Sequence, residues 1–253
     1  MMFLEGSFWA TLSVWQLLAL SLCFLWSGFV RSGLGFGGAA LALPLMLMVV
    51  NEPVLLLPAI CLHLLLFSSL TVASRIANVD WRYLLRLVLV IAIPFAAGLF
   101  GLLNLSGRFL SIVVYAVTLS YGLMYALNRV LVSGNRWVDA FCLTFGGYVS
   151  GVSLIGAPLI MAVSTRQLPA RQLRDTMFVV WIVLVIVKLS TFVGAGVDLQ
   201  WRLALAMLPL VGLGHWFGLK LHSHLVSGDR QFFNRIIGCG LMLVSILGLA
   251  TAL

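Results

Sequence analysis

The sequence predicts an all-α polytopic membrane protein of two inverted repeats with about five segments each, including two short broken half-helices. Three observations lead there: an apolar composition, glycine-rich breaks inside apolar segments, and motifs that recur about 120 residues apart. Hydrophobic residues make up 62% of the chain and charged residues 9%, whereas a soluble domain carries about 25% charged residues. The bilayer is therefore the expected solvent.

Charge and side-chain chemistry exclude several other classes of protein. The net charge is +8, but the basic residues are scattered between apolar stretches, which favours membrane topology over nucleic-acid binding. The sequence contains no Ser-His-Asp set, no HExxH motif and no paired carboxylate of the kind that indicates an enzyme. His215, His222 and His224 have no acidic or cysteine partner nearby for a metal. We therefore expect no enzymatic activity, no cofactor and no bound metal.

Two glycine-rich stretches interrupt the apolar segments. The first, GFVRSGLGFGGAALALP, covers residues 28–44, and the second, GGYVSGVSLIGAP, covers residues 146–158. Broken backbone at membrane depth is tolerated only where it is buried in protein or lines a cavity. The pair of breaks therefore predicts the position of the functional site.

Ten apolar segments follow from the hydropathy pattern. Two of them, Ala39–Val50 and Ala157–Thr165, are too short to cross the ~30 Å hydrocarbon core, because 12 residues at 1.5 Å per residue reach about 18 Å. The second break is expected at Ser150–Gly156. Six of the other segments are expected at about Leu12–Val30, from residue 54 to Ala73, and at Tyr83–Leu103, Val138–Val149, Leu203–Leu221 and Phe232–Leu253. The fifth segment is expected to end near Leu127 and the eighth near Phe192.

The two halves match beyond the breaks. Residues 28–30 (GFV) correspond to residues 147–149 (GYV), and Gly98 corresponds to Gly218. Since each half holds an odd number of segments, the second half is inverted, which is typical of secondary transporters. We predict repeats at residues 1–128 and 138–253, joined by a cytoplasmic linker at residues 129–137.

The distribution of Lys and Arg favours ten crossings with both termini outside. Twelve of these residues then face the cytoplasm, while Arg108 and Arg202 lie outside. If the two short segments re-enter without crossing, the positive charges divide nearly evenly between the two sides of the membrane. Glu5 precedes the first basic residue, Arg31, so the start lacks the basic region of a signal peptide. The expected location is a bacterial inner membrane.

The residues around the breaks favour anion binding. Two short helices beginning near Ala39 and Ala157 direct unpaired N–H groups and positive dipole ends into the protein. Glycine allows an oxyanion to approach the backbone closely, and serine hydroxyls add donors. The predicted substrate-binding residues are Arg31, Ser32, Gly33, Gly35, Gly37, Gly38, Ser150, Gly151, Ser153, Gly156, Pro158 and Lys188.

Structural alternatives stay open for these residues. Glycines four positions apart also fit close helix packing. The G-x-G-x-x-G run at residues 33–38 follows no strand, which argues against nucleotide binding. Arg31 serves either the site or an inner-surface anchor, and Lys188 either lines the site, forms a structural pair or extends to the surface.

Three further residues are predicted to take part in gating or coupling. His63 lies within an apolar segment, where a histidine relays protons or is a hydrogen-bonded core residue. Arg174 and Thr176 stand where the eighth segment begins, so a cytoplasmic charge at a helix start is their alternative interpretation.

The motifs taken together resemble the sulfite exporter TauE/SafE family, also called TSUP or DUF81. The resemblance extends from about Gly28 to Leu249. It implies a transporter of small anions, often sulfur-containing, such as sulfite, sulfonates or sulfoacetate. Arg31 departs from the family pattern, in which a small residue is expected, and the second break has fewer glycines. The pattern consists of G-x-x-x-x-G-x-G-x-G-G before Pro44, G-x-x-x-G with a later G-x-P, Arg174-x-Thr176, and Pro209 with Gly214 and Gly218.

The residues and the resemblance together predict a secondary transporter that exports a small anion, sulfite or an organosulfonate, by alternating access between the two breaks. An anion channel is the first alternative. A membrane enzyme or cofactor-handling protein is the second. The expected partners are the small anionic substrate and membrane lipid, without nucleic acid, and the oligomeric state stays open.

Overall fold

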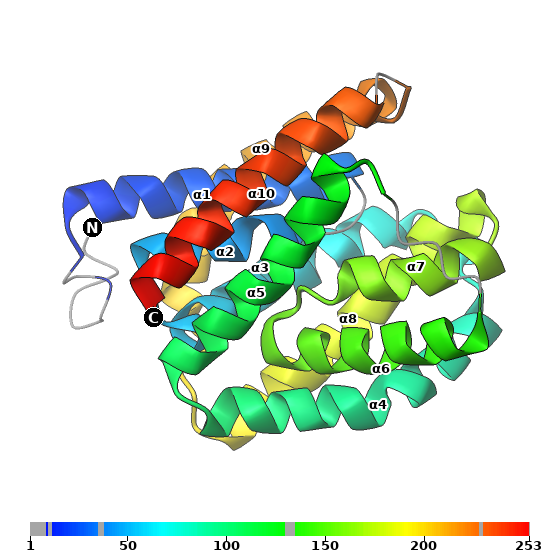
Figure 1. The fold of residues 1–253 in the computed structure, drawn as a ribbon, viewed down its shortest axis with the longest axis horizontal. Coiled ribbons are helices and arrows are strands. Elements are labelled where there is room, and N and C mark those ends of the chain that lie inside the picture. Colours follow the sequence, from blue (N-terminus) through cyan, green and yellow to red (C-terminus); the bar gives the residue numbers. More distant parts are fainter. Residues whose placement is uncertain (1–8, 10–11, 35–37, 130–134, 228–229, 253) are drawn as a thin grey trace.

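The computed structural model describes residues 9, 12–34, 38–129, 135–227 and 230–252 (Figure 1). Over these residues the chain forms α-helices and one short 3-10 helix, with no strand, which confirms the predicted all-α class. The helices are α1 (Val14–Leu34), α2 (Gly38–Val49), α3 (Pro53–Ala73), η3 (Ile76–Asn78), α4 (Trp81–Asn104), α5 (Gly107–Ala126), α6 (Arg136–Ser153), α7 (Ala157–Gln167), α8 (Ala170–Gly194), α9 (Trp201–Ser227) and α10 (Arg230–Ala252).

Helix length and composition identify an integral membrane protein. In the described part of the chain, seven helices are long and apolar enough to cross a bilayer, namely α1, α3, α4, α5, α8, α9 and α10. The predicted half-helices are α2, with 12 residues, and α7, with 11 residues. Both are too short to cross alone, as expected. The count of ten crossings and the orientation of the termini stay predictions.

Local sequence explains where several helices begin. The side-chain oxygens of Asp80, Ser106 and Asn135 accept hydrogen bonds from backbone N–H groups two or three residues later, at 2.9–3.3 Å. These residues cap α4, α5 and α6. Pro158 lies in the first turn of α7, where its missing N–H does no harm.

Two helices, α1 and α6, extend into the predicted breaks. The first continues past Val30 to Leu34, and α6 continues past Val149 to Ser153. The second break is therefore only residues 154–156, and it starts with Leu154 in the left-handed conformation at φ 62°. Ser32, Gly33, Ser150, Gly151 and Ser153 are therefore helical. Small residues are compatible with a membrane helix that packs closely on another.

The long helices pack in pairs that join the two predicted halves. In Figure 1, α1 lies along α9 at the top, and α4 lies along α6 at the bottom. Two further pairs are α5 with α10 and α3 with α8. Each short helix packs on the long helix that precedes it, α2 on α1 and α7 on α6. The short helices therefore lie between the two outer pairs.

Glycines bring the outer pairs into backbone contact. A Cβ atom at Gly218 of α9 would meet the carbonyl of Phe29 on α1, and one at Gly98 of α4 would meet the carbonyl of Tyr148 on α6. Gly214 and Gly151 make similar close approaches to Leu25 and Phe95. Helix packing, the alternative interpretation of the glycine pairs, is therefore observed in both outer pairs.

The two outer pairs use equivalent positions of the chain. Phe29 and Tyr148 are 119 residues apart, and Gly98 and Gly218 are 120 residues apart. The contact between Gly218 and Phe29 in one pair thus corresponds to the contact between Gly98 and Tyr148 in the other. An internal repeat predicts this correspondence, while the inverted orientation of the halves stays a prediction.

Candidate functional site

A small cavity lies where the two short helices begin. Its volume is about 30 Å³, counted as space for the centre of a water-sized sphere, and a single water needs about 10–15 Å³. The cavity therefore suits a compact ion rather than a large organic molecule. Its walls come from six helices and the second break, and they consist of Arg31, Gly38, Ala39, Leu64, Ser68, Ser150, Leu154, Ala157, Phe178 and Trp181.

Both helix N-termini open on this cavity. Gly38 is the first residue of α2 and Ala157 is the first residue of α7. Amides in a first helical turn have no intrahelical acceptor, and the helix dipole is positive there. In α7 the amides of Leu159 and Ile160 donate hydrogen bonds to the Gly156 carbonyl, each at 3.2 Å. Pro158 has no N–H, so the Ala157 amide is the remaining donor of that turn.

Four side chains of the cavity wall carry polar atoms without a hydrogen-bond partner among the described residues. These atoms are Nε and Nη2 of Arg31, Oγ of Ser68, Oγ of Ser150 and Nε1 of Trp181. The side chains are only 5%, 1%, 1% and 9% exposed, respectively. A buried polar atom without a partner costs about 1–3 kcal/mol. Four such residues around one cavity indicate a site that receives a ligand with hydrogen-bond acceptors.

Arg31 supplies the positive charge of the cavity. Its guanidinium carbon lies 5.1 Å from the centre of the Phe67 ring, and no acidic side chain belongs to the cavity wall that the structure describes. Because the side chain is buried, the alternative of a surface anchor does not fit. A charge held in an apolar membrane interior is costly, which makes Arg31 a candidate functional residue.

The family assignment follows from a match that includes every residue of this cavity wall. The family described as sulfite exporter TauE/SafE matches residues 20–247. The chain belongs to the TauE/SafE family. No curated protein and no solved structure matches the chain. TauE/SafE proteins are transporters that export sulfite and other anions and are not enzymes, and the helical membrane fold fits that activity.

Two predicted residues of this TauE/SafE protein support the end of α1 instead of lining the cavity. The Ser32 hydroxyl forms a hydrogen bond with Nδ1 of His215 on α9. The Ser32 carbonyl accepts a hydrogen bond from Nη2 of Arg174 at 3.2 Å. Gly33 packs through its backbone against Gly218. Gly35 and Gly37 lie outside the described residues.

Lys188 and its neighbours support the end of α6 in a similar way. Lys188 is fully buried, and its Nζ donates a hydrogen bond to the carbonyl of Gly151. It does not belong to the described cavity wall, and its burial excludes the alternative of extension to the surface. The Ser153 hydroxyl donates to the Val149 carbonyl at 3.1 Å. Gly156 precedes α7 as its N-terminal cap.

The three predicted gating or coupling residues connect helices and are not part of the cavity wall that the structure describes. His63 bonds through Nε2 to the Ala204 carbonyl at 2.7 Å, which matches the interpretation as a hydrogen-bonded core residue. The Thr176 hydroxyl accepts a hydrogen bond from the Asp80 amide at 3.0 Å, where α4 begins. Arg174 reaches the Ser32 carbonyl, as described above.

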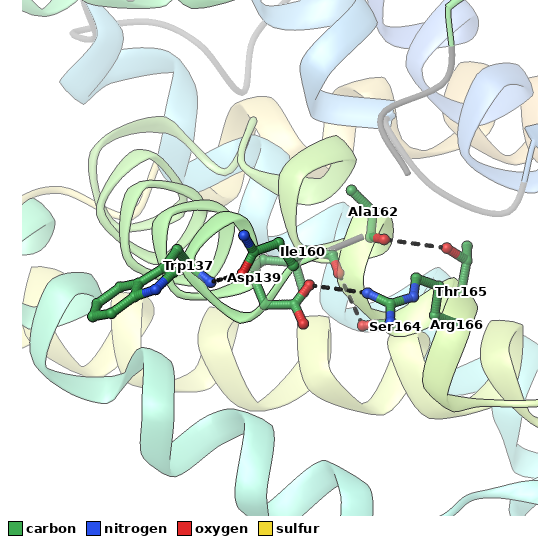
Figure 2. A network of polar contacts seen from close by, with 8 residues as sticks. Trp137, Asp139, Ile160, Ala162, Ser164, Thr165 and Arg166 are labelled. Carbon is green, nitrogen blue, oxygen red and sulfur yellow. Dashed lines mark hydrogen bonds and ion pairs between the residues drawn. The ribbon is translucent and has the colours of Figure 1, made fainter. Parts of the chain in front are cut away.

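A polar network joins α6 and α7 at the ends away from the break (Figure 2). Asp139 near the start of α6 lies 3.5 Å from Arg166 near the end of α7. The Ser164 hydroxyl donates to the Ile160 carbonyl at 2.9 Å and accepts from the Tyr83 hydroxyl of α4 at 2.8 Å. A partly exposed ion pair contributes about 0–1 kcal/mol, so this network orients the two helices more than it stabilises them.

Sequence reasoning missed Ser68 and Trp181. Trp181 lies near the middle of α8, whereas tryptophan in membrane helices is enriched at the interfaces. That unusual depth was the available signal. Ser68 stands 120 residues before Lys188, so the repeat pointed to it as well. Among the described residues, no cluster of His, Cys, Asp or Glu side chains is arranged to hold a metal.

Proposed function

We propose that this protein is a secondary transporter that exports a small oxyanion, sulfite or an organosulfonate, by alternating access around the described cavity. The observation that carries the proposal is the convergence of two helix N-termini and the buried Arg31 guanidinium on one small space. Partial and full positive charges in a site of low dielectric attract an anion strongly.

The position of the cavity supports alternating access. Arg31 and Ser150 are 119 residues apart, as are Gly38 and Ala157, and all four line the cavity. The cavity therefore lies between equivalent parts of the two predicted repeats. In transporters built from inverted repeats, the halves rock around a site of this kind.

The proposal includes a membrane orientation. Ten crossings with both termini outside a bacterial inner membrane leave Arg108 and Arg202 as the two basic residues on the outer side. The positive-inside rule supports this arrangement. Membrane lipid then surrounds the exposed apolar faces of the long helices.

Flux in proteoliposomes tests the function. Vesicles containing the purified protein are loaded with radiolabelled sulfite and exposed to unlabelled sulfite, sulfoacetate, taurine, sulfate or acetate. Saturable exchange with a sulfur oxyanion is the expected result, and protein-free vesicles provide the background. Absence of exchange by folded protein would contradict the transporter proposal. Unitary currents in planar bilayers would favour the anion channel instead.

A further inference from the structure

We infer that Ser68 and Trp181, together with Arg31 and Ser150, select a substrate that offers only hydrogen-bond acceptors to the cavity. The site then takes a compact oxyanion and rejects a sulfonate that also carries an ammonium group. The inference rests on the proposed anion site and deepens it, since it names the feature by which substrates are distinguished.

The polar atoms that face no partner are suited to donate. The indole Nε1 of Trp181 and the guanidinium nitrogens of Arg31 are donors without acceptor capacity. The hydroxyls of Ser68 and Ser150 donate or accept, and beside a bound anion they donate. These side chains come from α8, α1, α3 and α6, so they reach the cavity from four helices. An oxyanion with acceptor oxygens on several sides satisfies all of them together.

An ammonium group finds no acidic side chain in the described cavity wall. Asp175 is a buried carboxylate of α8, but it accepts a hydrogen bond from Asn78 at 2.9 Å and does not line the cavity. The Phe178 ring, which does line it, already has the Arg174 guanidinium carbon 5.6 Å from its centre. A substrate ammonium therefore loses water, meets the Arg31 charge, and gains no counter-ion.

The selecting side chains differ between the two halves. The positions equivalent to Ser68 and Trp181 at an offset of 120 are Lys188 and Cys61, and neither lines the described cavity. The donors that α3 and α8 add to Arg31 and Ser150 are therefore one serine and one tryptophan, whose equivalents in the other half are absent from the described wall.

Two conservative substitutions remove single donors. Trp181→Phe keeps an aromatic ring and removes the indole N–H, and Trp216→Phe, at a 49% exposed position of α9, is the matched control. Ser68→Ala removes one hydroxyl, and Ser120→Ala on the exposed face of α5 is its control. Thermal unfolding and size-exclusion profiles establish that each variant is folded.

Equilibrium binding of radiolabelled sulfite to purified protein gives the readout, with taurine and propane-1-sulfonate as competitors. Propane-1-sulfonate has a methyl group where taurine has the ammonium group. We expect propane-1-sulfonate to compete at least tenfold better than taurine. We expect Trp181→Phe and Ser68→Ala each to weaken sulfite binding by about tenfold, since a hydrogen bond to a charged group is lost. The two control variants bind as wild type.

The outcomes separate this inference from the proposed function. If wild-type protein binds sulfite, but both substitutions leave the affinity within twofold, the selecting role of these side chains is wrong while the transporter stands. Equal competition by the two sulfonates, whether strong or absent, overturns the rejection of ammonium. If wild-type protein binds no oxyanion at all, the proposed function fails and the inference fails with it.

Discussion

The two breaks in this TauE/SafE protein stand at equivalent positions but present different side chains to the cavity. Before the first break the cavity is lined by Arg31, and before the second by Ser150, 119 residues later. The residues that follow, Ser32 and Gly151, have carbonyls that accept hydrogen bonds from Arg174 and Lys188, respectively, both on α8. At both breaks, therefore, a cation of α8 bonds to a carbonyl at the end of the preceding helix. The two breaks differ in the charge that they present to the cavity, because Arg31 is cationic and Ser150 is neutral.

The comparison separates the roles of buried cations. The last carbonyls of a helix lack intrahelical donors, and a cation near them is favourable. Arg174 and Lys188 fill this role for α1 and α6. Arg31 has nitrogen atoms without a partner among the described residues, so its charge is available to a ligand. A cation in a membrane protein is thus interpreted by the atom it faces rather than by its depth.

The largest expected effect comes from removing the asymmetric charge. Arg31→Met should weaken sulfite binding by about 100-fold or more, since a charge-assisted interaction is lost. Thermal stability should be unchanged or higher, because a buried charge without a counter-ion is removed. Equilibrium binding and thermal unfolding check the two parts, with Arg202→Met, at an exposed position, as the control.

Exchanging the two side chains sharpens the test. The double variant with Arg31→Ser and Ser150→Arg moves the guanidinium to the equivalent position of the other half. If the halves are equivalent around the cavity, it should recover at least a tenth of wild-type sulfite affinity. Binding as weak as that of Arg31→Met would show that the two breaks are not interchangeable.

The next largest effect concerns the shared scaffold. Gly98→Ala and Gly218→Ala each place a methyl group against a backbone carbonyl of the neighbouring helix. Each should lower stability by about 1–3 kcal/mol, as overpacking does, and by similar amounts. Thermal unfolding in detergent is the measurement. Gly240→Ala, with open space around the added Cβ atom, should be neutral or stabilising, and an equal loss there would contradict the packing explanation.

A smaller effect is expected from the supporting cation of the second break. Lys188→Met removes the hydrogen bond to the Gly151 carbonyl but leaves the described cavity wall intact. Sulfite affinity should stay within about threefold, since Lys188 does not line the described cavity, while the maximal flux falls. Binding and flux measured on the same preparation distinguish this result. A large loss of affinity would return Lys188 to the binding site itself.

The smallest effect is expected from His63. Its Nε2 is engaged with the Ala204 carbonyl, and the side chain does not line the described cavity. His63→Gln, which keeps a polar group for that carbonyl, should leave the pH dependence of sulfite flux unchanged. A shifted pH profile, with folding intact, would instead support the proton relay.

Much of this architecture was predictable from residue types. The low content of charge required a bilayer, and the lengths of residues 39–50 and 157–165 required half-helices. Arg31, Gly38 and Ser150 were placed in the site because they flank the breaks, and all three line the cavity. The ends of α1 and α6 were placed too early, because glycine and serine interrupt helices in water but pack helices together in membranes.

The sequence alone thus determined the solvent, the helices, the two half-helix N-termini and a cationic residue beside the first of them. Those features depend on composition and on local hydrogen bonding, and both follow from the order of residues in the chain. Only the tertiary structure decided which cations support carbonyls, as Lys188 does, and which face the cavity, as Arg31 does. It also added Ser68 and Trp181, because helix packing brings these residues of α3 and α8 to one cavity.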